Sequence, residues 1–136
     1  MKRVWNCLLI CSVAAASLSL LSVETASAFP QFATEFQKKY VADEATDVQK
    51  HLAEEIKRVN KCNVCHDPRK GEDGKVSKKN RNPYGMALSE LLTADDKKDV
   101  EKIHKSLEKI EALKADDSGA TFGDLLKQGK VPYEYK

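Results

Sequence analysis

The stretch TDVQKHLAEEIKRVNKCNVCH, residues 46–66, joins a helical pattern to a compact group of cysteine and histidine. Apolar residues recur in it at spacings of three and four, which places them on one face of an α-helix. These residues are Val48, Leu52, Ile56 and Val59. The pattern predicts an amphipathic helix from Thr46 to about Asn60 that leads directly into the cysteine–histidine group.

That group, Cys62-Asn63-Val64-Cys65-His66, is a C-x-x-C-H motif, the signature of c-type haem attachment. Cysteines three residues apart lie within one helical turn. Both thiols can therefore bond the two vinyl groups at one porphyrin edge. His66 follows at once, and histidine is a usual proximal ligand of haem iron. The motif predicts one covalent haem c held by Cys62 and Cys65, with His66 as the iron ligand.

Three other structures could use the same residues. A disulfide between Cys62 and Cys65 suits an oxidising compartment. A thioredoxin-like redox pair requires a preceding strand and a βαβ setting, and the sequence predicts neither. A zinc site requires further ligands from His51, His66 or His104, and no second C-x-x-C group or H-x-x-H group is present. Haem attachment is favoured because the pentapeptide, the helical context and an export signal agree.

The remaining sequence also has helical periodicity, and it predicts an all-α domain. Phe32, Phe36 and Tyr40 form an aromatic stripe on a first short helix. A charged, glycine-containing loop is expected from Asp67 to Asn82. Asn82-Pro83 then begins a helix, Thr93 and Asp96 begin the longest helix as a capping-box-like pair, and Thr121 caps a last short helix that ends near Gly129.

The first 28 residues have the features of a cleavable export signal. Lys2 and Arg3 are followed by an uncharged stretch from Leu8 to Leu21, and Ala26-Ser27-Ala28 fits a cleavage site before Phe29. The uncharged stretch is shorter than the roughly 20 apolar residues of a membrane-spanning helix. We therefore expect a signal peptide at 1–28, one domain at 29–136 with no transmembrane segment, and a periplasmic location.

With these features the chain resembles the small exported monohaem cytochromes c. The resemblance extends from about Ala45 to Leu92 and rests on C-x-x-C-H at the end of a helix, a loop with glycine and lysine, and Asn82-Pro83-Tyr84-Gly85. It implies a small all-α domain wrapped around one haem, and electron transfer between membrane-associated complexes. It also implies that Pro83 helps to hold His66. The apolar faces of the predicted helices are narrow and would bury little surface by themselves. A large buried haem would supply the missing hydrophobic centre.

The second axial ligand of the iron stays open at this point. Family members usually supply a methionine from a loop far downstream. Met86, only 20 residues after His66, is the one methionine outside the signal. On the predicted helix it lies opposite the apolar face. His104, at the edge of an apolar helix stripe, is slightly favoured over it, and an open iron position is the third alternative.

The sequence therefore predicts a periplasmic electron carrier that is not itself an enzyme. One alternative is a haem protein that binds or senses nitric oxide or carbon monoxide. Another is a small haem subunit of a larger oxidoreductase. The loop after the motif is rich in Lys and Arg and is expected to attract an acidic redox partner. A chain with 23 basic and 21 acidic residues does not have the strongly basic character of a nucleic-acid-binding domain, and we find no catalytic constellation.

Overall fold

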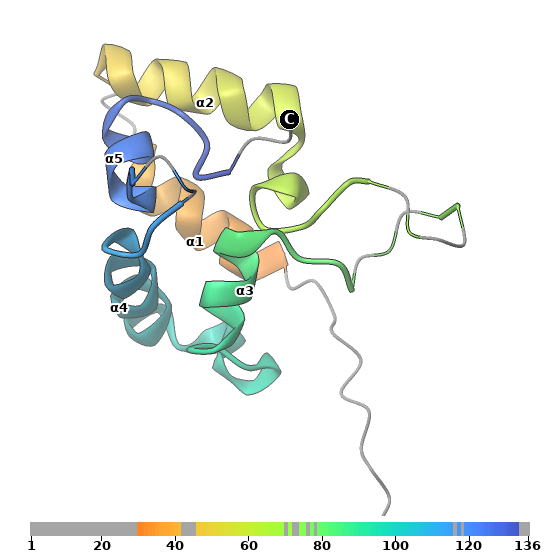
Figure 1. Ribbon diagram of the computed structural model, residues 1–136. Helices are drawn as coiled ribbons and strands as arrows, with labels where there is room; N and C mark the ends of the chain where they lie inside the picture. Colours follow the sequence, from red (N-terminus) through yellow and green to blue (C-terminus); the bar gives the residue numbers. More distant parts are fainter. Residues whose placement is uncertain are drawn as a thin grey trace, which may run out of the picture.

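The computed structural model of the chain describes residues 30–41, 46–69, 71, 74–75, 77, 79–115, 117 and 119–133. Within these residues it contains helices and no strand, which confirms the all-α prediction (Figure 1). The helices, in order, are α1 (Pro30–Tyr40), α2 (Asp47–Val59), the 3-10 helix η1 (Lys61–Val64), α3 (Pro83–Ser89), the 3-10 helix η2 (Ala94–Lys98), α4 (Val100–Glu111) and α5 (Phe122–Lys127). The proposed signal at 1–28 lies outside the described residues. Among the helices described, none is long and apolar enough to cross a membrane.

Most of the helix starts lie where the capping residues predict them. Thr46 and Gln49 form a capping box at the start of α2, and Asn82 caps α3 with Pro83 in its first turn. The prediction for the longest helix was wrong. Thr93 and Asp96 cap the separate helix η2, and α4 begins only after Asp99, whose side chain accepts a hydrogen bond from the Lys102 amide. The chain needs a new cap there because the backbone leaves helical geometry at Asp99.

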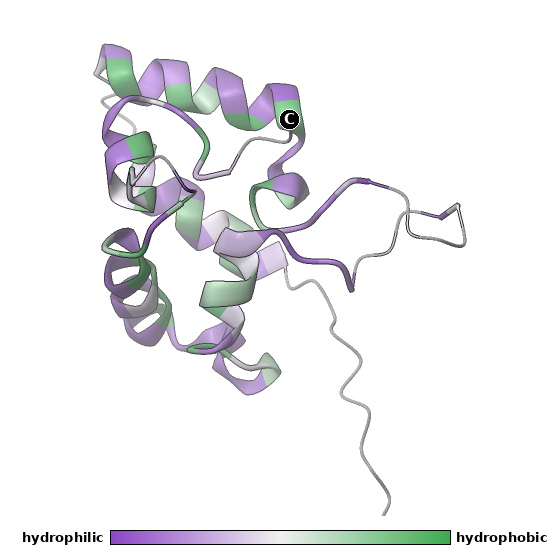
Figure 2. Ribbon diagram, in the orientation of Figure 1, coloured by the Kyte–Doolittle hydropathy of each residue, from purple (hydrophilic) through white to green (hydrophobic). Residues whose placement is uncertain are grey.

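The core of the described residues lies where α1, α3 and α5 pack against α4. Tyr84 is fully buried at its centre and meets Phe36 and Phe122 edge to face, with ring centroids 5.9 and 5.1 Å apart. Ile103 and Leu107 of α4 are also fully buried. Figure 2 shows hydrophobic and hydrophilic residues alternating along these helices, as expected where one face of each is buried.

The buried side chains form one apolar cluster. The buried apolar cluster extends from Phe36 to Val131 and includes residues of every α-helix. The prediction that the domain wraps around one haem stays a prediction.

The described parts of residues 67–82 leave the helical body after η1 and return to it at α3 (Figure 1). His66 and Arg81, at the base of this excursion, form an antiparallel β-bridge. The bridge brings the segment that precedes α3 against the cysteine–histidine motif. It thereby builds the site from two segments that are about 15 residues apart in the sequence.

Candidate functional site

The C-x-x-C-H motif lies in η1 and the turn that follows it. Asn60 caps the C-terminus of α2, and its φ of 68° is unusual for a residue other than glycine and is tolerated best by asparagine. The Asn60 side chain then accepts a hydrogen bond from the Cys62 amide at 3.1 Å, which starts η1. Cys62 is exposed, Cys65 is half-buried, and both are free thiols. The motif is thus a tight turn directly attached to the end of a long helix.

His66 is oriented by the backbone of the returning segment. Its Nδ1 lies 3.3 Å from the carbonyl oxygen of Asn80, which also accepts a hydrogen bond from the Asp67 amide at 3.0 Å. Histidines that bind metals commonly donate their other ring N–H to such a carbonyl, which fixes the tautomer and the ring orientation. The ring of His66 is therefore held with Nδ1 toward the Asn80 carbonyl.

Asn82 ties the motif to α3 through every polar group that it has. Its Nδ2 donates to the carbonyls of Asn63 and Val64 at 3.1 and 3.0 Å, and its Oδ1 accepts from the Gly85 amide at 2.8 Å. Its backbone amide donates to the Cys65 carbonyl at 3.1 Å, and its own carbonyl accepts from Met86. The side chain is buried. Asn82 therefore acts as a clamp between the turn of the motif and the first turn of α3.

Gly85 allows α3 to approach the motif closely. A Cβ atom added there would collide with the Cys65 carbonyl oxygen and would lie only 2.8 Å from the carbonyl carbon. Since those atoms belong to the backbone, they cannot move aside as a flexible side chain could. Glycine is therefore required at this position by the packing of α3 on Cys65.

These contacts give a physical reason for the Asn82-Pro83-Tyr84-Gly85 segment. Asn82 and Gly85 contact the motif, together with the Asn80 carbonyl. Pro83 is exposed in the first turn of α3, and its expected role in holding His66 stays a prediction. The Asn-Pro helix start revealed Asn82 as a cap, but its second role required the bridge between His66 and Arg81.

The two cysteines differ in their surroundings. Burial raises the pKa of the Cys65 thiol to about 12, and the neighbouring Cys62 adds to this shift while Arg81 opposes it. The thiol of Cys65 is consequently protonated in the folded chain at neutral pH, and a thiol is a far weaker nucleophile than a thiolate. This environment suits a cysteine that is held in place, and it is the opposite of that of a reactive redox thiol.

The candidates for a second iron ligand lie in different settings. His104 points its Nε2 at Glu35 Oε2, 3.1 Å away on α1, where Glu35 is buried. A hydrogen bond from Lys38 lowers the pKa of Glu35, burial opposes this effect, and His104 adds to it. Met86 is exposed, with 58% of its surface accessible. His51 uses its Nδ1 on the Gly129 carbonyl. None of the three is brought together with the motif by a described contact.

The structure also bears on the three other uses of the motif. Cys62 and Cys65 are not bonded to each other. The element before the motif is α2, where a thioredoxin-like pair would need a strand. Within the described residues, which include all three histidines, no group of three His, Cys, Asp or Glu side chains could hold a metal ion. The zinc site considered from the sequence is therefore not formed by these residues.

The residues present fit a covalent haem by the chemistry of their side chains. They supply two free thiols within one turn and an adjacent imidazole whose Nδ1 is already engaged.

The basic loop is only partly described, since Lys70 and Lys78 lie outside the described residues. Arg69 is paired with Asp67 at 2.7 Å, and Lys75 and Lys79 are exposed.

Comparisons with known proteins identify no relative of this chain. No family model matches it, no curated protein is similar to it, and no solved structure resembles it.

Proposed function

We propose that this chain is an exported protein that carries one haem c and transfers electrons in the periplasm. The observation that carries the proposal is the joint placement of Cys62, Cys65 and His66. Two free thiols lie in a single turn, and the next residue is a histidine whose Nδ1 faces a backbone carbonyl. A histidine whose Nδ1 faces a backbone carbonyl is typical of a proximal iron ligand.

Each residue of the site has a distinct task in this proposal. Cys62 and Cys65 attach the haem through thioether bonds, and His66 binds its iron through Nε2. Asn80 fixes the tautomer of His66 through its carbonyl, while Asn82 holds the turn rigid against α3. When bound, the haem iron supplies one-electron chemistry by alternating between its ferric and ferrous states. A rigid ligand set favours such chemistry because little has to move when the charge changes.

Basic residues near the motif support a partner with an acidic surface. Lys75, Lys79 and Arg81 lie in the segment that leads from the motif back to α3. Like-signed charge around a redox centre raises the encounter rate with an oppositely charged partner. Electron transfer to an acidic donor or acceptor is therefore the form of the proposal that the charge distribution supports.

A second candidate function, the binding of nitric oxide or carbon monoxide, is favoured by the setting of His104. Its Nε2 faces the buried Glu35 carboxylate, so binding iron through that nitrogen would break this contact. Glu35 would keep its contacts with Gln31 and Lys38 but would lose the one with His104. Met86 is directed to solvent from α3. An iron atom without a second protein ligand would be accessible to a small gas molecule.

Absorption spectra of the exported protein, with and without carbon monoxide, test the proposal. We expect a c-type spectrum, and a ferrous form that carbon monoxide does not alter if the protein is an electron carrier. A large shift on adding carbon monoxide would favour the gas-binding candidate. His66→Ala should change the spectrum in either case, whereas His51→Ala, whose ring contacts Gly129 and not the motif, should not. A correctly exported protein without haem absorption would refute both candidates.

A further inference from the structure

A small cavity lies where α1, α2, α4 and α5 meet, and its volume is about 120 Å³. Tyr40 of α1 and Glu111 of α4 supply a hydroxyl and a carboxylate to its lining. Apolar side chains and one lysine come from α2 and α5, and they are Val48, Leu52, Leu126 and Lys127. A cavity of about 150 Å³ holds one benzene molecule, so this cavity accommodates a ligand of only a few heavy atoms.

Tyr40 and Glu111 are joined by a hydrogen bond beside the buried core. The Tyr40 hydroxyl donates to Glu111 Oε1 at 2.7 Å. Burial raises the pKa of Tyr40 far above its usual value, and the Glu111 carboxylate adds to this shift. The nearby Tyr84 hydroxyl is fully buried and forms no hydrogen bond with any described residue, Glu111 included. Tyr40 is therefore the one donor that the described part of the core offers to Glu111.

Glu111 has no cationic partner within the described part of the chain. Its side chain is half-buried and forms no ion pair there. Lys127, which lines the same cavity, is exposed and does not pair with it. Glu111 is also the last residue of α4, and the C-terminal end of a helix carries a partial negative charge that favours a cation. Since charged groups that are withdrawn from water are usually paired, this end of the cavity favours a positive charge.

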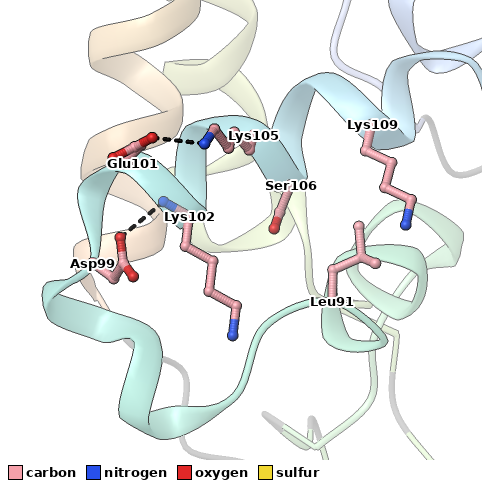
Figure 3. Close-up of a pocket in the computed structure, with 7 residues that line it drawn as sticks. All are labelled: Leu91, Asp99, Glu101, Lys102, Lys105, Ser106 and Lys109. Atoms are coloured by element: carbon pink, nitrogen blue, oxygen red, sulfur yellow. Dashed lines mark hydrogen bonds and ion pairs between the residues drawn. The ribbon is translucent and has the colours of Figure 1, made fainter.

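The wider groove beside α4 has a different arrangement (Figure 3). There Glu101 accepts a hydrogen bond from Lys105 Nζ at 2.6 Å, and both side chains are exposed. An exposed ion pair of this kind contributes little. Glu111 differs from Glu101 because it is half-buried, lines a narrow cavity and is unpaired within the described residues. Glu101 is therefore a matched control on the same helix.

From these observations we infer that the cavity binds a small molecule through a primary ammonium group. Such a group has three N–H donors and a positive charge. It donates to the Glu111 carboxylate and to Tyr40 Oη, which can accept because its own proton is directed at Glu111. The alkyl part of the ligand lies against Leu52 and Leu126. The inference does not depend on haem attachment, because the cavity and the C-x-x-C-H motif share no residue.

An amide NMR titration of the exported mature protein tests this site. Propylammonium chloride and β-alanine are the two probes, and sodium chloride at equal ionic strength is the reference. We expect saturable shifts of the Glu111, Gly123 and Leu126 amides with at least one probe. A stronger response to propylammonium identifies a simple amine as the ligand, whereas a stronger response to β-alanine identifies an amino acid whose carboxylate Lys127 binds. The absence of saturable shifts with both probes would overturn the inference.

Three variants assign the binding to this cavity. Glu111→Gln keeps an oxygen that accepts from Tyr40 but removes the charge, and it should lower the affinity at least about tenfold. Glu101→Gln removes the same charge from α4 outside the cavity and should leave the affinity within about twofold of the wild-type value, since non-specific attraction is weak in salt. Tyr40→Phe keeps the ring without its hydroxyl and should weaken binding about threefold to tenfold, which decides the matter if Glu111→Gln fails to fold. Equal affinities of the two glutamate variants, or a Tyr40→Phe protein that binds as tightly as the wild type, would overturn the inference.

Discussion

Replacing Asn82 by alanine should destabilise the folded chain by about 3 kcal/mol. The side chain caps α3 through the Gly85 amide, and losing such a cap costs about 1 kcal/mol. It also donates to the Asn63 and Val64 carbonyls. Leaving these two acceptors without a partner costs about 1 kcal/mol each, because the contacts are buried or partly buried. One substitution removes all three contacts, so their costs add in the free energy of unfolding.

Urea unfolding followed by circular dichroism measures this loss, and two further variants assign it. Asn82→Asp keeps the oxygen that caps α3 but replaces the donating amide by an acceptor that faces two carbonyls. It should therefore remain at least about 2 kcal/mol less stable than the wild type, although aspartate is a good helix cap. Asn80→Ala is the matched control, since only the backbone carbonyl of Asn80 takes part in the site. It should change stability by no more than about 0.5 kcal/mol. A loss below about 1 kcal/mol in Asn82→Ala, or an Asn82→Asp protein as stable as the wild type, would refute the role of Asn82 as a clamp.

Three further predictions concern the thiols and the basic loop. In folded protein prepared without haem, the exposed Cys62 should react with iodoacetamide at least about 100-fold faster than Cys65; equal rates would show that the Cys65 thiol is not protected. The stability of the same haem-free protein should be unaffected by this thiol below pH 9 and should fall between pH 9 and about pH 12, because the folded pKa of Cys65 is raised to about 12. Cys65→Ser should remove the part of the stability loss between pH 9 and about pH 12 that the Cys65 thiol causes. The same pH dependence of stability in the wild type and in Cys65→Ser would contradict the assignment of this loss to Cys65. Reversing the charges of Lys75, Lys78 and Lys79 should slow the reaction with an acidic redox partner and weaken the salt dependence of its rate, while leaving the absorption spectrum unchanged. Rates that do not depend on ionic strength in either the wild type or the variant would exclude electrostatic steering by this loop.

Helix type and most helix starts follow from local chemistry, and the sequence predicts them well. The stripe from Leu52 to Ile56 and the caps at Thr46, Asn82 and Thr121 act over a few neighbouring residues, so their effect is visible without the fold. Thr93 shows the limit of this reasoning. A capping box starts a helix but does not determine how far it continues, and here it starts only η2.

The support of the motif could not be predicted in the same way because it depends on contacts between distant segments. The Asn80 carbonyl meets His66, and Asn82 meets Asn63 and Val64, only once the loop returns beside η1. His104 likewise finds Glu35 across the interface of α1 and α4, 69 residues away in sequence. The centre of the domain is a further case, since narrow apolar stripes from several helices combine into a core filled by side chains.

Covalent attachment of haem to residues 62–66 is the measurement that tests the central proposal most directly. The protein should be produced with its export signal in cells that mature c-type haems, then denatured and extracted with acidified acetone. We expect the haem to remain with the protein, and a proteolytic peptide containing Cys62, Cys65 and His66 to carry it in the mass spectrum. The Cys62→Ser, Cys65→Ser double variant should carry none. Haem released into the organic phase, or exported wild-type protein with both thiols free, would contradict the account.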